Sequence, residues 1–207
     1  APWRGEVEGT TVGPGSIRAA AAEFESLYRR LNRREYVHPD PLEFLYQYDD
    51  PEDREIVGLV ASSLAYGRVK QILRSVSLAL ERMGGSPAGF VRDSSPERLR
   101  ASFEGFKHRF TTGEDLARML EGVREVVQEH GSLEACFASL VGEDDETVVP
   151  ALTEFTRMIL SGAAGGACPL PDPGRGSACK RLHLYLRWMV RRDEVDPGGW
   201  GRVSPSK

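Results

Sequence analysis

Residues 50–85 read DPEDREIVGLVASSLAYGRVKQILRSVSLALERMGG and carry two helical patterns separated by a glycine. In the first pattern, Pro51 stands at the favoured first position of a helix, and the apolar residues in 56–64 recur at helical spacing. Gly67 interrupts this pattern, which resumes beyond it and stops at Gly84. The stretch therefore predicts helices at 51–65 and 68–83, or one rod kinked at Gly67.

The same helical spacing extends in both directions from this stretch, and no segment shows the alternation of a strand. Connections between the predicted helices are mostly short, which is typical of a compact all-α domain. We expect that domain to span 16–207, after a flexible segment at 1–15, and to be truncated at its C-terminal end. The further helices are predicted at 16–34, 95–104, 113–130, 133–141, 147–161 and 177–192.

The composition indicates a globular protein with an acidic balance. Apolar residues make up 40% and charged residues 28% of the 207 residues, which excludes a wholly disordered chain. The longest mostly apolar stretch, 56–66, is too short to span a bilayer. The net charge of −4 excludes a polycation, so any surface for nucleic acid must be a local cationic patch.

Cysteine and histidine residues are few and scattered. Cys136, Cys168 and Cys179 include no C-x-x-C pair, so neither a disulfide framework nor a zinc knuckle is encoded. The four histidines show no metal-ligand spacing. We therefore expect a cytoplasmic protein with no metal, no cofactor and no membrane association, whose oligomeric state stays open.

The last predicted helix has an apolar face and a cationic face. Apolar residues such as Leu182 and Met189 share one side of it, and the opposite side carries Lys180, Arg187 and Arg191. The surrounding segment holds six basic residues and no acidic one. Two interpretations are open for the two arginines: they compensate the helix macrodipole in the last turn, or they contact the phosphates of a nucleic acid.

Lys180 falls in the first turn of this helix, at the positive end of its dipole. That position lowers the pKa of an amine and makes the amine a better nucleophile. The backbone N–H groups that follow Gly174 and Gly176 suit a phosphate equally well, with Lys180 supplying a positive charge. Three roles are therefore open for Lys180: a solvated surface lysine, a phosphate-binding residue or a nucleophile.

Several motifs resemble the bacterial family catalogued as domain of unknown function 2400. The most specific one is GSACKRLHLYLRWMVR at 176–191, which is followed by VDPGGW at 195–200. The resemblance covers residues from about 40 to 200 and implies kinship without a reaction, since the family has no established activity. Shorter matches are DPLEFLY at 40–46, DREIVG at 53–58, LAYGRVKQI at 64–72 and HRFT at 108–111.

The order of segments is also similar to that of the helix-hairpin-helix DNA glycosylases, such as endonuclease III. In those enzymes a glycine-rich hairpin leads into a helix whose early lysine attacks the sugar, and 173–180 resembles that arrangement. The resemblance implies a DNA-binding repair protein in which Gly176 approaches a phosphate and Lys180 is the catalytic residue. The chain departs from the pattern at Ala178, where the hairpin has its second glycine, and lacks the downstream aspartate and the four-cysteine iron–sulfur loop. We therefore expect this chain by itself to be inactive.

The break at Gly67 is a second candidate for nucleic-acid contact. Glycosylases of this layout present a loop to the minor groove here, and Tyr66, Arg68 and Lys70 combine a stacking side chain with two cations. A packed tyrosine beside two solvated cations is the alternative. The expected site for duplex DNA therefore comprises Tyr66, Arg68, Lys70, Gly176, Arg187 and Arg191.

A competing hypothesis from another class is a non-enzymatic helical module that docks a partner protein. Its cationic face and the side chains of Trp188 or Trp200 would then form the contact. The two hypotheses differ in the surroundings of Lys180, because an enzyme requires this side chain to open into a concave pocket.

Overall fold

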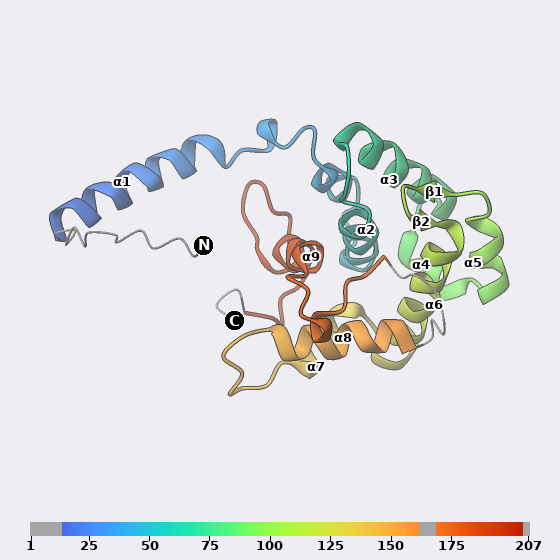
Figure 1. Ribbon diagram of the computed structural model, residues 1–207. Coiled ribbons are helices and arrows are strands. Elements are labelled where there is room, and N and C mark those ends of the chain that lie inside the picture. The colour runs from blue at the N-terminus through green and yellow to red at the C-terminus, as the bar shows by residue number, and fades with distance from the viewer. Residues whose placement is uncertain (1–13, 162–168, 205–207) are drawn as a thin grey trace, which may run out of the picture. The chain divides into compact units, whose positions relative to one another are not determined.

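The computed structural model describes residues 14–161 and 169–204 (Figure 1). Contacts divide the chain into two compact units, one ending at Tyr36 and the other beginning at Val37. The segment 1–15, which we expect to be flexible, lies outside the described residues except for Pro14 and Gly15, the first residues of a helix. The predicted extent of the domain, 16–207, remains a prediction.

The first unit consists of α1 (Pro14–Leu31) and a short 3-10 helix, η1 (Arg34–Tyr36). The sequence predicts a helix at 16–34, so α1 begins two residues earlier and ends three residues earlier than predicted. Its large apolar side chains are exposed: the exposed fraction is 69% for Phe24 and 51% for Leu31. The amphipathic pattern of α1 therefore has no core of its own to cover.

The second unit is mostly helical, as the sequence predicts. Two further 3-10 helices are η2 (Pro41–Gln47) and η3 (Pro173–Arg175), and a small antiparallel sheet pairs β1 (Lys107–His108) with β2 (Thr111–Thr112). The α-helices are α2 (Pro51–Ser63), α3 (Val69–Met83), α4 (Pro87–Asp93), α5 (Pro96–Ser102), α6 (Gly113–His130), α7 (Leu133–Leu140), α8 (Val149–Ser161) and α9 (Lys180–Val190).

Three parts of this unit differ from the sequence-based predictions. No helix is predicted from the sequence at α4, which starts at Pro87 and is capped by the side chain of Ser86. No strand is predicted either, because strands as short as β1 and β2 cannot show an alternating pattern. The last helix begins at Lys180 instead of 177, because Cys179 has a left-handed backbone conformation with φ 45° and ψ 36°.

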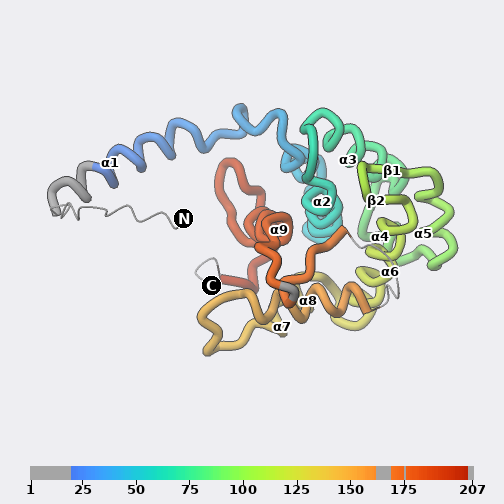
Figure 2. Tube along the Cα trace, viewed as in Figure 1, coloured from blue at the N-terminus to red at the C-terminus, as the bar shows by residue number. Residues whose placement is uncertain are grey.

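The second unit is packed around α2. Its N-terminus is capped by Asp50, whose side chain accepts a hydrogen bond of 2.9 Å from the backbone N–H of Glu52. Every residue from Glu55 to Ser63 is buried, so α2 needs neighbours on all sides. Figure 2 shows α2 between α9 and α3, and contacts with η2, α4 and α7 complete its surroundings.

Burial of α2 brings the carboxyl group of Glu55 into the core, where it is 3% exposed. Its oxygens accept hydrogen bonds from the backbone N–H groups of Leu133 (2.8 Å) and Glu134 (3.0 Å), the first residues of α7. The indole Nε1–H of Trp200 donates a third bond of 3.0 Å. Burial raises the pKa of Glu55 to about 7 in spite of these donors. One carboxyl group thus joins α2 to α7 and to the C-terminal segment.

α6 and α8 approach each other so closely at Gly122 that no side chain fits between them. A Cβ atom added to Gly122 would lie 1.8 Å from the carbonyl oxygen of Ile159. Glycine is a poor helix former, at a cost of about 1 kcal/mol relative to alanine. Close packing of the two helices is the reason that α6 contains one here.

We expect Gly122→Ala to lower the free energy of unfolding by about 1–3 kcal/mol, because the added methyl group forces the two backbones apart. Urea denaturation measures this loss. The matched control is Gly85→Ala, since a Cβ atom at Gly85 meets no atom within 4 Å, and its effect should stay within about 0.5 kcal/mol. Equal effects of the two substitutions would contradict this account of the packing.

Candidate nucleic-acid interface

β1 and β2 form a hairpin with Arg109 and Phe110 at its tip, and its register pairs His108 with Thr111. The side chains alternate, so His108 and Thr111 are buried while Lys107 is exposed. A two-stranded hairpin is marginally stable by itself in water. The contacts of its buried side chains therefore decide whether the tip has a fixed position.

Tyr66, in the loop between α2 and α3, contacts both strands of the hairpin. Its hydroxyl group donates a hydrogen bond of 2.9 Å to the carbonyl oxygen of His108 and shares one of 2.7 Å with the hydroxyl group of Thr111. The backbone N–H of Thr111 donates a third bond, of 3.2 Å, to the hydroxyl oxygen of Tyr66. The rings of Tyr66 and His108 meet edge to face with centroids 4.7 Å apart. The loop and the hairpin are thus one connected structure.

The imidazole of His108 has an exposed fraction of 0%, and both of its nitrogen atoms are bonded. Because a carbonyl oxygen only accepts, Nε2–H donates to the backbone oxygen of Tyr66 at 3.0 Å. In the neutral ring Nδ1 then accepts from the hydroxyl group of Ser75 at 2.9 Å. Burial lowers the pKa of His108, and the charges of Arg109 and Arg181 add to this effect. His108 is therefore neutral at neutral pH.

The lowered pKa of His108 makes the stability of the second unit depend on pH. The unfolded chain binds this proton more readily than the folded one, so the contribution of neutral His108 is complete above pH 6.5 and is lost as the pH falls below it. As the pH falls below 6.5, we expect the free energy of unfolding of the wild type to decrease more than that of His108→Gln, whose side chain does not titrate. Urea denaturation at several pH values measures the difference, and equal losses would refute the role of His108.

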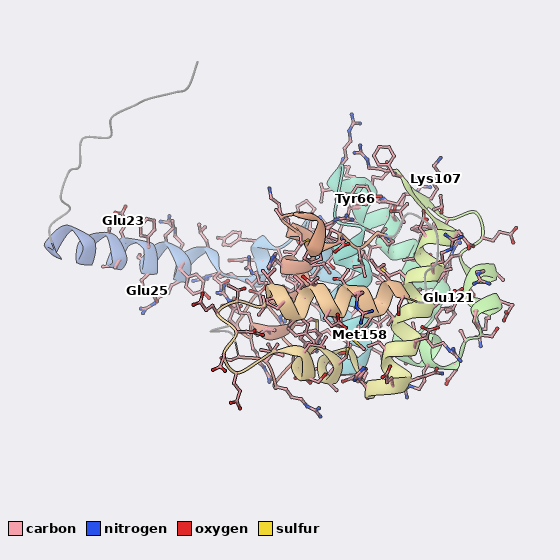
Figure 3. All side chains as sticks on the ribbon, turned by 60° about the horizontal axis from the view of Figure 1, so that its bottom comes forward. Glu23, Glu25, Tyr66, Lys107, Glu121 and Met158 are labelled. Carbon is pink, nitrogen blue, oxygen red and sulfur yellow. The ribbon has the colours of Figure 1, made fainter. Side chains whose placement is uncertain are left out.

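Four cationic side chains and one aromatic side chain are exposed where the α2–α3 loop meets the hairpin. They come from 64–80 and 105–113, two segments without aspartate or glutamate in a chain of net charge −4. Figure 3 shows Tyr66 and Lys107 on the same side of the second unit, away from Glu121 and Met158. The exposed residues that form this hairpin surface are Arg68, Lys70, Lys107, Arg109 and Phe110.

A third cationic segment reaches the hairpin surface from α9. The guanidinium group of Arg181 lies over the ring of Tyr66, with 4.9 Å from Cζ to the ring centroid. Arg181 also donates a hydrogen bond to the carbonyl oxygen of Ser63, the last residue of α2. The start of α9 is therefore fixed beside the hairpin surface.

The structure places the residues predicted around Gly67 as follows. Tyr66 is half-buried and has the contacts of a packed tyrosine, which was one of its two interpretations. Arg68 is the N-cap residue of α3 and Lys70 lies in its first turn, and both are exposed. The two cations can therefore reach a ligand, while Tyr66 positions the hairpin.

Arg187 and Arg191 have carboxylate partners within the chain. Oδ2 of Asp196, which is 0% exposed, lies 3.1 Å from Nε of Arg187 and 3.3 Å from Nε of Arg191. Arg191 also pairs with Asp193 at 2.7 Å. Burial raises the pKa of Asp196, and the hydrogen bond from Arg187 opposes this shift. Both arginines hold the C-terminal turn against α9, and their contact with phosphate remains a prediction.

Lys180 is exposed at the first position of α9. A pocket of about 290 Å³ beside this helix is lined by its later residues, among them His183 and Leu186, and does not include Lys180. Gly176 has a left-handed conformation with φ 72°, and its N–H donates to the carbonyl oxygen of Pro173 at 3.1 Å. The roles of Lys180 as nucleophile and of Gly176 as a phosphate contact stay predictions.

Other parts of the second unit bear on the competing hypothesis and on cofactors. Trp188 and Trp200 are 2% and 5% exposed, so neither indole ring is available to dock a partner. Within 14–161 and 169–204, no group of three or more histidine, cysteine, aspartate or glutamate residues is placed to hold a metal ion. No helix in the same described ranges is long and apolar enough to cross a membrane.

Four residues at this place are absent from the site predicted from the sequence: Lys107, Arg109, Phe110 and Arg181. Three of them lie in an acid-free segment that also contains His108, and that absence of acid is the signal available in the sequence. The fourth adjoins Lys180 on the cationic helix, where only a tertiary contact distinguishes it from its neighbours.

The fold and this surface define a mostly helical protein with an exposed basic and aromatic patch. A family model described as "Protein of unknown function (DUF2400)" matches residues 40–207, which include the hairpin surface and exclude α1. The chain therefore belongs to this family, as its motifs indicate. Neither the curated proteins nor the solved structures contain a match, so the endonuclease III-like layout remains a prediction.

Proposed function

We propose that this protein binds duplex DNA through the hairpin surface. The observation that carries the proposal is the convergence of four exposed cations and an exposed phenylalanine from two acid-free segments of an acidic chain. Cationic side chains bind the phosphate backbone and release its counterions, and an exposed aromatic ring stacks on bases. Both kinds of contact are available on this one surface.

The cations of the hairpin surface are better suited to phosphate than the arginines of α9. In the described part of the chain, Arg187 and Arg191 pair with carboxylates, whereas no carboxylate pairs with Arg68, Lys70 or Lys107. A cation that already has a carboxylate partner must give it up to bind phosphate. The hairpin surface requires no such exchange.

The hairpin surface is also held in position before any ligand binds. Tyr66, His108 and Thr111 fix the hairpin to the α2–α3 loop through four hydrogen bonds of 2.7–3.2 Å. A surface that is already ordered loses less conformational entropy on binding. This arrangement supports a binding role for the hairpin tip.

Charge reversal tests the proposal. We expect Arg68→Glu combined with Lys107→Glu to weaken binding to duplex DNA and to reduce the slope of log Kobs against log salt by about one for each phosphate that the protein no longer neutralises. Fluorescence anisotropy with a labelled duplex over a salt series measures both quantities. An unchanged slope would count against the hairpin surface.

The matched control for this test is Arg157→Glu, which reverses one charge on α8. Arg157 is exposed and pairs with Glu154 on the same helix, so its substitution should have little effect on stability. Figure 3 shows Met158, a residue of the same helix, away from Tyr66 and Lys107. The DNA affinity of Arg157→Glu should follow the wild type apart from the change in net charge, and a loss as large as that of the double variant would indicate a non-specific effect.

A second candidate function is the removal of a base, with Lys180 as the nucleophile. The contact of Arg181 with Tyr66 supports it, because this contact sets the start of α9 beside the hairpin surface, whereas the pocket beside α9 does not include Lys180. In this reaction the amine of Lys180 attacks C1′ of the sugar, the base leaves as the N-glycosidic bond breaks, and opening of the sugar ring gives the imine. An abasic site gives the same imine with loss of water and needs the amine alone, so this step is open even to a chain that does not remove a base by itself.

Borohydride trapping tests the second candidate. Borohydride reduces the imine to a stable amine, so a DNA carrying an abasic site should become covalently attached to the wild type and not to Lys180→Ala. Denaturing gel electrophoresis detects the adduct. Equal trapping by both forms, or by neither, would remove Lys180 from this role and leave the binding proposal in place.

A further inference from the structure

Phe110 is 80% exposed at the tip of the hairpin, in contrast to the three phenylalanines nearest to it in sequence, two of which are buried. The guanidinium group of Arg109 lies over its ring, with 5.5 Å from Cζ to the ring centroid. A cation at this distance is attracted to the face of the ring. Arg109 therefore lies over one face of Phe110, and most of the side chain stays open to solvent.

Two features define the position of Arg109: its backbone conformation and its contact with Gly67. Its φ of 52° lies in the left-handed region, which a residue with a Cβ atom adopts at a cost. Its side chain runs along the backbone of Gly67, where an added Cβ atom would lie 2.8 Å from Cδ of Arg109. Arg109 thus lies between Gly67 and Phe110 and supports the ring from one side.

We infer that Phe110 stacks its ring on a nucleobase whose own face is exposed, so that the preferred ligand is duplex DNA with an interrupted base stack, such as a gap or an end. A ring inserted between two stacked bases needs both faces free, and Arg109 lies over one face of Phe110. Bases inside a continuous duplex are covered on both sides, whereas a gap leaves one face uncovered. This inference rests on the proposed function and adds the class of DNA that the hairpin surface prefers.

The cations around Phe110 agree with this class of ligand. Lys107 on β1 and Arg68 and Lys70 at the start of α3 are exposed, and α3 packs against β1. A duplex next to the gap supplies phosphates for them while its terminal base lies on the ring. Both contacts form at once only where the stack is interrupted.

The test compares two DNA ligands of the same sequence and length: a duplex sealed by a hairpin loop at both ends, and the same duplex with a single-nucleotide gap. We expect the wild type to bind the gapped form about tenfold more tightly, the effect of stacking one base on an aromatic ring. Phe110→Ala should lose this preference and bind the two forms with affinities that agree within a factor of about two. Phe110→Trp should keep the preference, because the indole ring also stacks.

A fluorescent base analogue beside the gap gives a second measurement that does not depend on affinity. The emission of the analogue should change when the wild type or Phe110→Trp binds, because the analogue then stacks on the aromatic ring. It should not change when Phe110→Ala binds. The matched control is Phe24→Ala, since Phe24 is a second exposed phenylalanine, at 69%, on α1. It should bind both ligands as the wild type does.

The outcomes separate this inference from the proposed function. Equal affinity of the wild type for the sealed and gapped ligands would overturn the inference and leave duplex binding intact. An equal loss of affinity for both ligands in Phe110→Ala would also overturn it, since the ring would then contribute to duplex binding in general. A wild type that binds neither ligand at low salt would overturn the proposed function itself.

Discussion

A carboxyl group in a protein core needs hydrogen-bond donors, and Glu55 obtains its donors from distant parts of the chain. Its partners Leu133 and Trp200 are 78 and 145 residues away in sequence. A buried carboxyl group without such partners is costly, so α2 can be buried on all sides only when α7 and the C-terminal segment are in place. The rest of the second unit is arranged around this requirement.

The hairpin surface depends on α2 through a short series of contacts. α2 ends at Ser63, whose carbonyl oxygen is bound by Arg181, and the loop that follows presents Tyr66. Tyr66 in turn holds the hairpin through His108. The hairpin that carries Phe110 is therefore connected to the core by hydrogen bonds, and a binding surface requires such support from the elements beneath it.

Tertiary contacts separate the arginines that pair with carboxylates from those that stay exposed. Arg187 and Arg191 lie on a cationic helix, and the sequence alone makes them good candidates for phosphate contact. The structure pairs them with Asp196, which is buried at the turn after α9. Arg68 and Arg109 belong to less conspicuous segments, yet both are exposed, and Arg109 lies over the exposed ring of Phe110.

The sequence by itself determined the α-helices of the second unit other than α4, because helical periodicity and capping act over a few neighbouring residues. The prediction for α6, 113–130, agrees with the structure at both ends. The motifs also indicated the family, whose model matches 40–207. Only the tertiary structure decided which cations remain without a carboxylate partner and how the hairpin is held. The physical reason is that these features depend on pairs such as Tyr66 and His108, which are 42 residues apart and leave no local pattern in the sequence.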